Sequence, residues 1–326
     1  MSYDVIGLGA PVVDQVLKIS EDYLSTISGE KGGQAPLEIN SLHSIVKKSS
    51  SMPLQVPGGS ATNTIRALAN LGRKCALVGK IGKDELGEYF FSSLLSLGIK
   101  PLLIETAHFS TAQSLCLITP DGERTMRTYL GASVEMKTED LKKSDFKKLR
   151  LLHVEGYALY NRPVIYKTMQ LAKEAGAKIS LDLASFEIVR EFKKDIWNLL
   201  EDFVDIIFAN EKEIIELGYL EDQKSICRDL SNICEISVLL MGKKGCALAY
   251  RGNLSTYPSY SVDVLDTTGA GDLFAGGFLH GYLEGRSLEE NVHYGTLLSS
   301  KVIQSLGTEI SQNLWNKIKM DIPTFH

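Results

Sequence analysis

The chain has 326 residues, 44% of them apolar, and a formal net charge of −5. This length and apolar content suffice for one large α/β domain or two ordinary ones, and they argue against a mainly disordered chain. The acidic balance argues against nonspecific binding to nucleic acid or to an anionic membrane, which needs clustered Lys and Arg. We therefore expect a small-molecule partner.

The cysteines and the N-terminus point to a soluble cytoplasmic protein. The five cysteines are widely spaced and include no Cys-x-x-Cys pair, so the sequence suggests neither a disulfide framework nor a zinc site. The N-terminus lacks a basic segment, and no run of about 18 apolar residues occurs in the sequence.

Residues 5–8 form a predicted buried strand that runs into Gly7-Leu-Gly-Ala-Pro11. A dinucleotide fingerprint would need glycine at Val12, and Pro11 disfavours direct entry into a helix, so we reject that motif. Asp14 lies just beyond the strand. Its carboxylate could accept two hydrogen bonds from a vicinal diol, or it could simply form a turn.

Residues 15–57 contain polar and Gly/Ser-rich pieces and are expected to form either a lid or a disordered insertion. Gly58 and Gly59 then precede a predicted helix over 62–71. Paired glycines allow a ligand to approach closely, and Asn63 offers both a donor and an acceptor to a hydroxyl. The alternative is an ordinary turn into a helix.

A strand over 75–80 and a helix over 84–97 give a βαβ rhythm. Strands over 113–119 and 124–130, joined by Pro120-Asp-Gly-Glu123, form a predicted hairpin, which we place at the base of the lid. Arg124 and Arg127 could meet a phosphate. Because exposed hairpin arginines are usually solvated, we assign neither to the site.

From residue 151 onward, predicted strands over 151–154, 178–181, 204–209 and 236–240 alternate with helices, which indicates a mainly parallel sheet covered on both faces. Asp182 and Asn210 follow two of these strands, at the sheet edge where ligands gather. Asn210 and Glu213 have the spacing of a capping box, but a carboxylate in this place could also bind Mg²⁺ partly through water.

The stretch Asp266-Thr-Thr-Gly-Ala-Gly-Asp272 opens a predicted helix. Amides of Gly269, Ala270 and Gly271 at a helix start can bind an anion such as phosphate, and Asp272 could accept a proton from a substrate hydroxyl. We expect the helix start to keep the pKa of Asp272 low. This arrangement favours a phosphotransferase, although Asp272 could also be a simple cap.

Two motifs together resemble a known family. Asp-Thr-Thr-Gly-Ala-Gly-Asp272-Leu-Phe and Gly58-Gly-Ser-Ala-Thr-Asn63-Thr through Gly72 resemble the signatures of the ribokinase-like (PfkB) carbohydrate and nucleoside kinases. The resemblance extends from Gly7 to about Gly307 and is closest to the adenosine-kinase-like branch. It implies a single domain over 1–326, with a three-layer, doubly wound, mainly parallel α/β sheet. It also implies a small β-sheet lid from about 15–57 and about 100–130.

The resemblance also implies ATP and Mg²⁺ as cofactors and gives roles to individual residues. Asp272 would be the base, Glu213 would bind Mg²⁺ through water, and Asp266 is a candidate K⁺ ligand. Met241 departs from a threonine that is common in the family. The remaining implied contacts are Asp14, Gly58, Gly59 and Asn63 for the substrate, and Asn210, Gly242, Gly245, Ser299 and Ile303 for ATP.

We therefore expect an ATP-dependent kinase, monomeric or homodimeric, that phosphorylates a primary hydroxyl of a nucleoside such as adenosine. Adenosine kinases commonly carry Gly-Asn-Pro where this chain has Gly9-Ala-Pro11, so a free sugar such as fructose or ribose stays open as the acceptor. A non-catalytic sensor of sugars or nucleotides is the second class of function. The sequence contains no P-loop, no Gly-x-Ser-x-Gly and no His-Glu-x-x-His motif.

Overall fold

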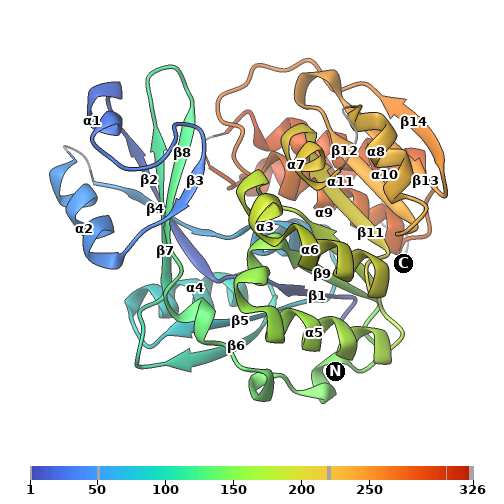
Figure 1. The fold of residues 1–326 in the computed structure, drawn as a ribbon, viewed down its shortest axis with the longest axis horizontal. Coiled ribbons are helices and arrows are strands. Elements are labelled where there is room, and N and C mark those ends of the chain that lie inside the picture. The colour runs from blue at the N-terminus through green and yellow to red at the C-terminus, as the bar shows by residue number, and fades with distance from the viewer. Residues whose placement is uncertain (1, 50–51, 219–221, 306, 323–326) are drawn as a thin grey trace.

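The computed structural model describes residues 2–49, 52–218, 222–305 and 307–322, whose strands form one large and one small sheet (Figure 1). The large sheet has the order β14 (Asn253–Tyr257), β13 (Cys246–Tyr250), β12 (Ile236–Leu240), β11 (Ile206–Asn210), β10 (Lys178–Asp182), β9 (Leu151–Glu155), β1 (Val5–Leu8), β5 (Cys75–Gly82), β6 (Lys100–Thr106). The small sheet has the order β3 (Gln34–Pro36), β8 (Arg124–Tyr129), β7 (Ala112–Ile118), β2 (Val12–Lys18), β4 (Leu54–Gly58).

The large sheet is parallel from β12 to β6, and only β13 and β14 at one edge run antiparallel. In its centre, Val5 of β1 pairs with Leu151 of β9 on one side and with Cys75 of β5 on the other. All four residues of β1 are buried. Such apolar runs form parallel strands because helices cover both faces of the sheet.

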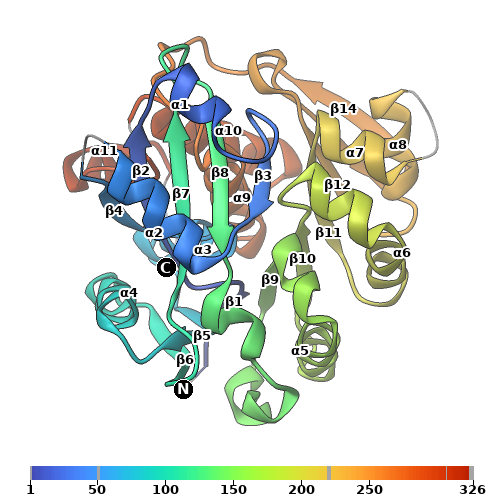
Figure 2. The same cartoon turned by 60° about the vertical axis from the view of Figure 1, so that its left-hand side comes forward.

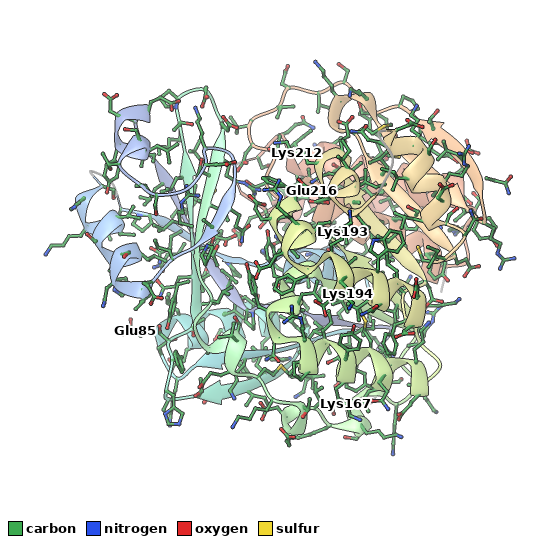
Figure 3. The ribbon with its side chains drawn as sticks, in the orientation of Figure 1. Glu85, Lys167, Lys193, Lys194, Lys212 and Glu216 are labelled. Carbon is green, nitrogen blue, oxygen red and sulfur yellow. The ribbon has the colours of Figure 1, made fainter. Side chains whose placement is uncertain are left out.

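Helices pack on both faces, as the sequence predicts, and Figure 2 shows the sheet between them. One face packs against α5 (Arg162–Glu174), α6 (Phe186–Asp202), α7 (Glu211–Leu217) and α8 (Gln223–Leu230). The other packs against α3 (Ser60–Asn70), α4 (Glu85–Ser96), α9 (Ala270–Leu283) and α10 (Leu288–Val302), with α11 (Gln312–Asp321) behind α10. Charged side chains such as Lys167, Lys194 and Lys212 lie along the outer side of α5–α7 (Figure 3).

The small sheet, with α1 (Glu21–Ser25) and α2 (Ile39–Lys48), lies at one end of the large sheet and has its own apolar core (Figure 1). It is built from residues 12–58 and 112–129 and includes the predicted hairpin of β7 and β8. The second lid segment, expected over about 100–130, starts later than expected, at residue 112. Residues 100–106 form β6, which returns from α4 and pairs in parallel with β5, as a βαβ unit requires.

Most of the predicted helices and strands begin and end within a few residues of the observed ones. The helix predicted over 84–97 is α4, whose N-cap Asp84 accepts a hydrogen bond from the Gly87 amide at 2.8 Å. In the described ranges, no helix combines the length and apolar character that a membrane span needs.

Candidate active site

A cavity of about 760 Å³ lies where the carboxyl ends of the parallel strands face the small sheet. Glu155, Asp182 and Asn210, the last residues of β9, β10 and β11, line it from the large sheet. Asp14 of β2 and Arg124 of β8 line it from the small sheet. This volume falls within the range of about 300–1,000 Å³ that is usual for ligand pockets.

The glycine turn before α9 forms one wall of the cavity. Gly269 is the N-cap and has a φ of 73°, a left-handed conformation that favours glycine. The Ala270 amide donates to the Thr267 carbonyl at 3.3 Å, whereas the amides of Gly269 and Gly271 meet no acceptor among the described residues. Free amides at the start of a helix of this length form a site for an anion.

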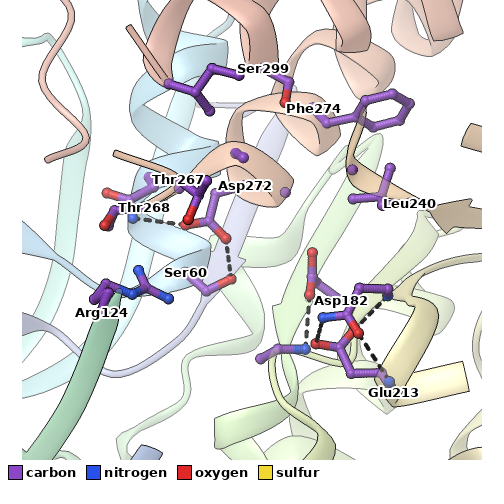
Figure 4. Close-up of a pocket in the computed structure, with 18 of the residues that line it drawn as sticks. Ser60, Arg124, Asp182, Glu213, Leu240, Thr267, Thr268, Asp272, Phe274 and Ser299 are labelled. Carbon is purple, nitrogen blue, oxygen red and sulfur yellow. Dashed lines mark hydrogen bonds between the residues drawn. The ribbon is translucent and has the colours of Figure 1, made fainter. Parts of the chain in front are cut away.

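Asp272 lies in the first turn of α9, and its carboxylate is fixed by α3 (Figure 4). Ser60 Oγ donates to its Oδ1 and Asn63 Nδ2 to its Oδ2, both at 2.8 Å. The pKa of Asp272 is raised, chiefly by burial, although these two donors and the charge of Arg124 act to lower it. The expectation of a low pKa is therefore wrong, because desolvation outweighs the favourable helix start.

Gly58 and Gly59 bring α3 close to the acidic residue of β2. A Cβ on Gly58 would lie 2.1 Å from Asp14 Oδ2, so the Asp14 carboxylate occupies the space of a side chain there. Gly59 has a φ of 95°, and a Cβ on it would lie 2.6 Å from the Ala10 carbonyl oxygen. Gly59 and Asn63 line the cavity, whereas Gly58 does not line it and contacts the Asp14 carboxylate.

Asp14 itself is 7% exposed and points into the cavity. No described residue donates a hydrogen bond to its carboxylate, and the charges that act on it come from Arg124, Asp272 and Arg66. Burial raises its pKa to about 7. Asn63 Oδ1 is a second buried acceptor without a partner in the described part of the chain. Both acceptors belong to residues that line the cavity, so hydroxyl or amine groups of a ligand could donate to them.

Asn210 and Glu213 form the capping box that the sequence left as an alternative to a metal site. Glu213 accepts hydrogen bonds from the Asn210 amide at 2.8 Å and from Asn210 Nδ2 at 2.5 Å. Burial raises the pKa of Glu213 to about 7. Asp182 is buried nearby, and its pKa is raised by burial and by the charge of Glu213 (Figure 4). No Lys, Arg or His among the described residues forms an ion pair with either acid.

The cavity is also lined by four residues that the family resemblance assigns to ATP: Gly242, Gly245, Ser299 and Ile303. Gly245 has a φ of 90°, and a Cβ there would lie 1.9 Å from the Tyr257 carbonyl oxygen. Met241, in contrast, is 7% exposed and packs in the core away from the cavity. The apolar side chain that faces the cavity here is Leu240.

Asp266 does not line the cavity but fastens the loop that leads to α9. Its Oδ1 accepts from the Thr268 amide at 2.9 Å and from Thr268 Oγ1 at 2.6 Å, and its Oδ2 accepts from the Gly307 amide at 2.8 Å. Three of its roughly four acceptor positions are therefore already used.

The two hairpin arginines have different environments. Arg124 points from β8 toward Ser60 and Asp272 and pairs with no carboxylate in the described ranges (Figure 4). Arg127 is 1% exposed and donates to the carbonyls of Ser28 and Glu30, so it is not solvated. The expectation that both hairpin arginines are exposed and solvated is therefore wrong, since Arg124 is half-buried and lines the cavity. Arg124 begins β8 and Arg127 lies three residues later. The two side chains therefore lie on opposite faces of the strand.

Sequence reasoning also missed Glu155 and Tyr157. Glu155 is 1% exposed, and Tyr157 donates to Gln34 Oε1 at 2.5 Å across the gap between the sheets. A signal was present in the sequence. Glu155 ends an apolar run and is followed by glycine and an aromatic residue, and the end of a parallel strand lies at the edge of the sheet where ligands bind.

Comparison with known proteins places the chain in a family. Residues 40–315 match the model of the pfkB family carbohydrate kinases. Probable fructokinase-5 of Arabidopsis thaliana is 31% identical over 69% of this chain and 73% of its own. Two solved structures superpose on this chain with a TM-score of 0.92. One is a probable sugar kinase from Rhizobium etli CFN 42, which is 30% identical over 98% of this chain and 98% of its own. The other is the adenosine kinase from Sinorhizobium meliloti, which is 29% identical over 98% of this chain and 99% of its own. The chain belongs to the pfkB family of carbohydrate kinases, which are phosphotransferases that act on hydroxyl groups.

Proposed function

We propose that the protein transfers the γ-phosphate of ATP to a primary hydroxyl of a nucleoside such as adenosine. The observation that supports this most directly is the pairing of two features in one cavity. The partly buried Asp272 carboxylate lies in the first turn of α9, whose start carries the Gly269 and Gly271 amides that meet no acceptor among the described residues. A proton acceptor next to an anion site is what phosphoryl transfer to an alcohol requires.

In the proposed reaction, the substrate hydroxyl oxygen forms a bond to the γ-phosphorus, and the bond from that phosphorus to the bridging oxygen of ADP breaks. The hydroxyl proton passes to the Asp272 carboxylate, whose raised pKa makes it a better acceptor than an ordinary aspartate. The amides of the glycine turn and the Arg124 guanidinium would stabilise the charge on the transferring phosphoryl group.

The acceptor end of the cavity suits a nucleoside. Asp14 and Asn63 Oδ1 accept no hydrogen bond from a described residue and could receive the two ribose hydroxyls. Apolar and aromatic side chains also line the cavity, and such side chains suit a flat base. They include Val12, Met126, Leu130, Tyr157 and Ala184.

Glu213 and Asp182 fit Mg²⁺, since they are buried acids with raised pKa values and form no ion pair with a described cationic residue. Bound there with ATP, Mg²⁺ would neutralise phosphate charge. Asp266 fits K⁺ less well, because its existing hydrogen bonds leave room for about one further contact.

A free sugar such as fructose or ribose is the second candidate acceptor. It is favoured by the 31% identity to Probable fructokinase-5 and by Ala10, which offers no side-chain amide to a nucleoside.

The test is ADP release from ATP and Mg²⁺ with a panel of nucleosides and free sugars, with and without K⁺. A preference for adenosine, inosine or guanosine supports the proposal. Turnover with only a hexose or pentose would support the second candidate instead. If no acceptor in the panel is phosphorylated, both candidates are refuted.

A further inference from the structure

Glu155 makes two hydrogen bonds that join segments far apart in the sequence. Its Oε1 accepts from the Ala10 amide and its Oε2 from the Ala61 amide, both at 2.7 Å. The side chain is buried and ends β9, the strand beside β1. A carboxylate that accepts two backbone amides in this way holds both segments at a fixed separation.

The two segments are connections between the large and the small sheet. Residues 9–11 lead from β1 to β2, which carries Asp14, and residue 59 leads from β4 to α3, which carries Asn63. The segments also touch directly, since a Cβ on Gly59 would lie 2.6 Å from the Ala10 carbonyl oxygen. A change in their separation would therefore shift Asp14 relative to Asn63, two acceptors of the cavity to which no described residue donates.

Gly9 makes room for this arrangement. A Cβ on Gly9 would lie 2.6 Å from Glu155 Oε2 and 2.8 Å from the Ala61 Cβ. Any side chain at position 9 would push the carboxylate away from the Ala61 amide. Gly9 and Glu155 thus form one structural unit with the start of α3.

We infer that Glu155 is a positioning residue for acceptor binding, which acts by holding the Ala10 and Ala61 segments together so that Asp14 and Asn63 face the same ligand. This role rests on the proposed function, because it assigns the acceptor to the Asp14 end of the cavity. Glu155 does not need to touch the acceptor, since each of its oxygens is already bound to an amide.

The test compares Glu155→Gln with Glu213→Gln in the full chain. Both replace a buried glutamate by its isostere, but at different places around the cavity. Glutamine keeps one oxygen and turns an amino group toward the second amide, so one hydrogen bond is lost. We expect Glu155→Gln to raise the KM for the acceptor about tenfold, which is about 1.4 kcal/mol, and the KM for ATP less than about twofold. Glu213→Gln should affect the dependence on ATP and Mg²⁺ instead.

Amide hydrogen exchange of the ligand-free protein supplies a readout that does not depend on activity. In Glu155→Gln, exchange should become faster at whichever amide, that of Ala10 or of Ala61, faces the new amino group, and in Glu213→Gln both should exchange at the wild-type rate. Gly9→Ala should reproduce the effect of Glu155→Gln on exchange and on the acceptor KM, which covers the case that Glu155→Gln does not fold.

Three outcomes would overturn the inference or its basis. A raised acceptor KM with unchanged exchange would mean that Glu155 contacts the acceptor itself, and the positioning role would be wrong. An unchanged acceptor KM together with unchanged exchange would also refute it. If the wild-type protein phosphorylates no acceptor, the proposed function fails, whereas the exchange rates still decide whether Glu155 joins the two segments.

Discussion

Gly58→Ala tests the placement of Asp14 with one added methyl group. Gly58 ends strand β4 with an extended backbone that alanine also adopts, so the substitution adds volume without backbone strain. The new Cβ would lie 2.1 Å from Asp14 Oδ2, whereas an ordinary contact begins at 3.4 Å. The Asp14 carboxylate must therefore move by more than about 1 Å, a displacement that can cost about 100-fold in rate when it affects a positioned group.

We expect kcat/KM for the acceptor to fall about 100-fold, equivalent to about 2.7 kcal/mol, at saturating ATP. The assay is the initial rate of ADP release with the preferred acceptor. Gly98→Ala is the matched control: its φ of 70° strains alanine, but no atom lies within 4 Å of the new Cβ. It should lower the free energy of unfolding by about 1 kcal/mol and leave the acceptor kinetics unchanged. A folded Gly58→Ala protein with kcat/KM within about threefold of wild type would refute the assignment of Asp14 to the acceptor.

Further predictions concern charge. Asp14→Asn should change how the free energy of unfolding depends on pH. Burial raises the pKa of Asp14 to about 7. The folded protein therefore keeps a proton on Asp14 that the unfolded chain loses from about pH 4 upward. The free energy of unfolding of the wild type, measured by urea titration, should therefore fall relative to Asp14→Asn between about pH 4 and 7, by up to about 4 kcal/mol; parallel curves would contradict this. Arg124→Ala should lower kcat about 100-fold in the same rate assay while the Kd for ATP changes little, because its charge serves the transferring phosphoryl group; an unchanged kcat would place the guanidinium elsewhere. Arg127→Ala should speed amide exchange over residues 28–33, whose carbonyls it binds, and exchange at the wild-type rate would show that the loop is held by other contacts.

Much of the fold follows from local patterns. Apolar runs such as Val5–Leu8 predict buried parallel strands, and Pro120-Asp-Gly-Glu123 predicts the hairpin that the structure contains. The glycine turn before α9 could be predicted because its residues are consecutive and the signal lies in one motif.

The wrong predictions concern properties that depend on residues distant in the sequence. The pKa of Asp272 depends on how far the folded chain removes it from water, and no local pattern predicts that desolvation. Arg124 and Arg127 looked alike in the sequence, but the register of β8 on β7 directs Arg124 to the cavity and Arg127 to the loop over 28–33. Glu155 binds the amides of residues 10 and 61, which only the folded chain brings together.

The measurement that tests the central claim most directly compares turnover and binding in Asp272→Asn. The asparagine keeps the shape of the side chain but cannot accept the hydroxyl proton, so kcat should fall by about 10²- to 10⁴-fold. Calorimetric titration should show acceptor binding close to that of the wild type, and Asp202→Asn, at an exposed position at the end of α6, should match the wild type in both measurements. Undiminished turnover in Asp272→Asn would contradict the account.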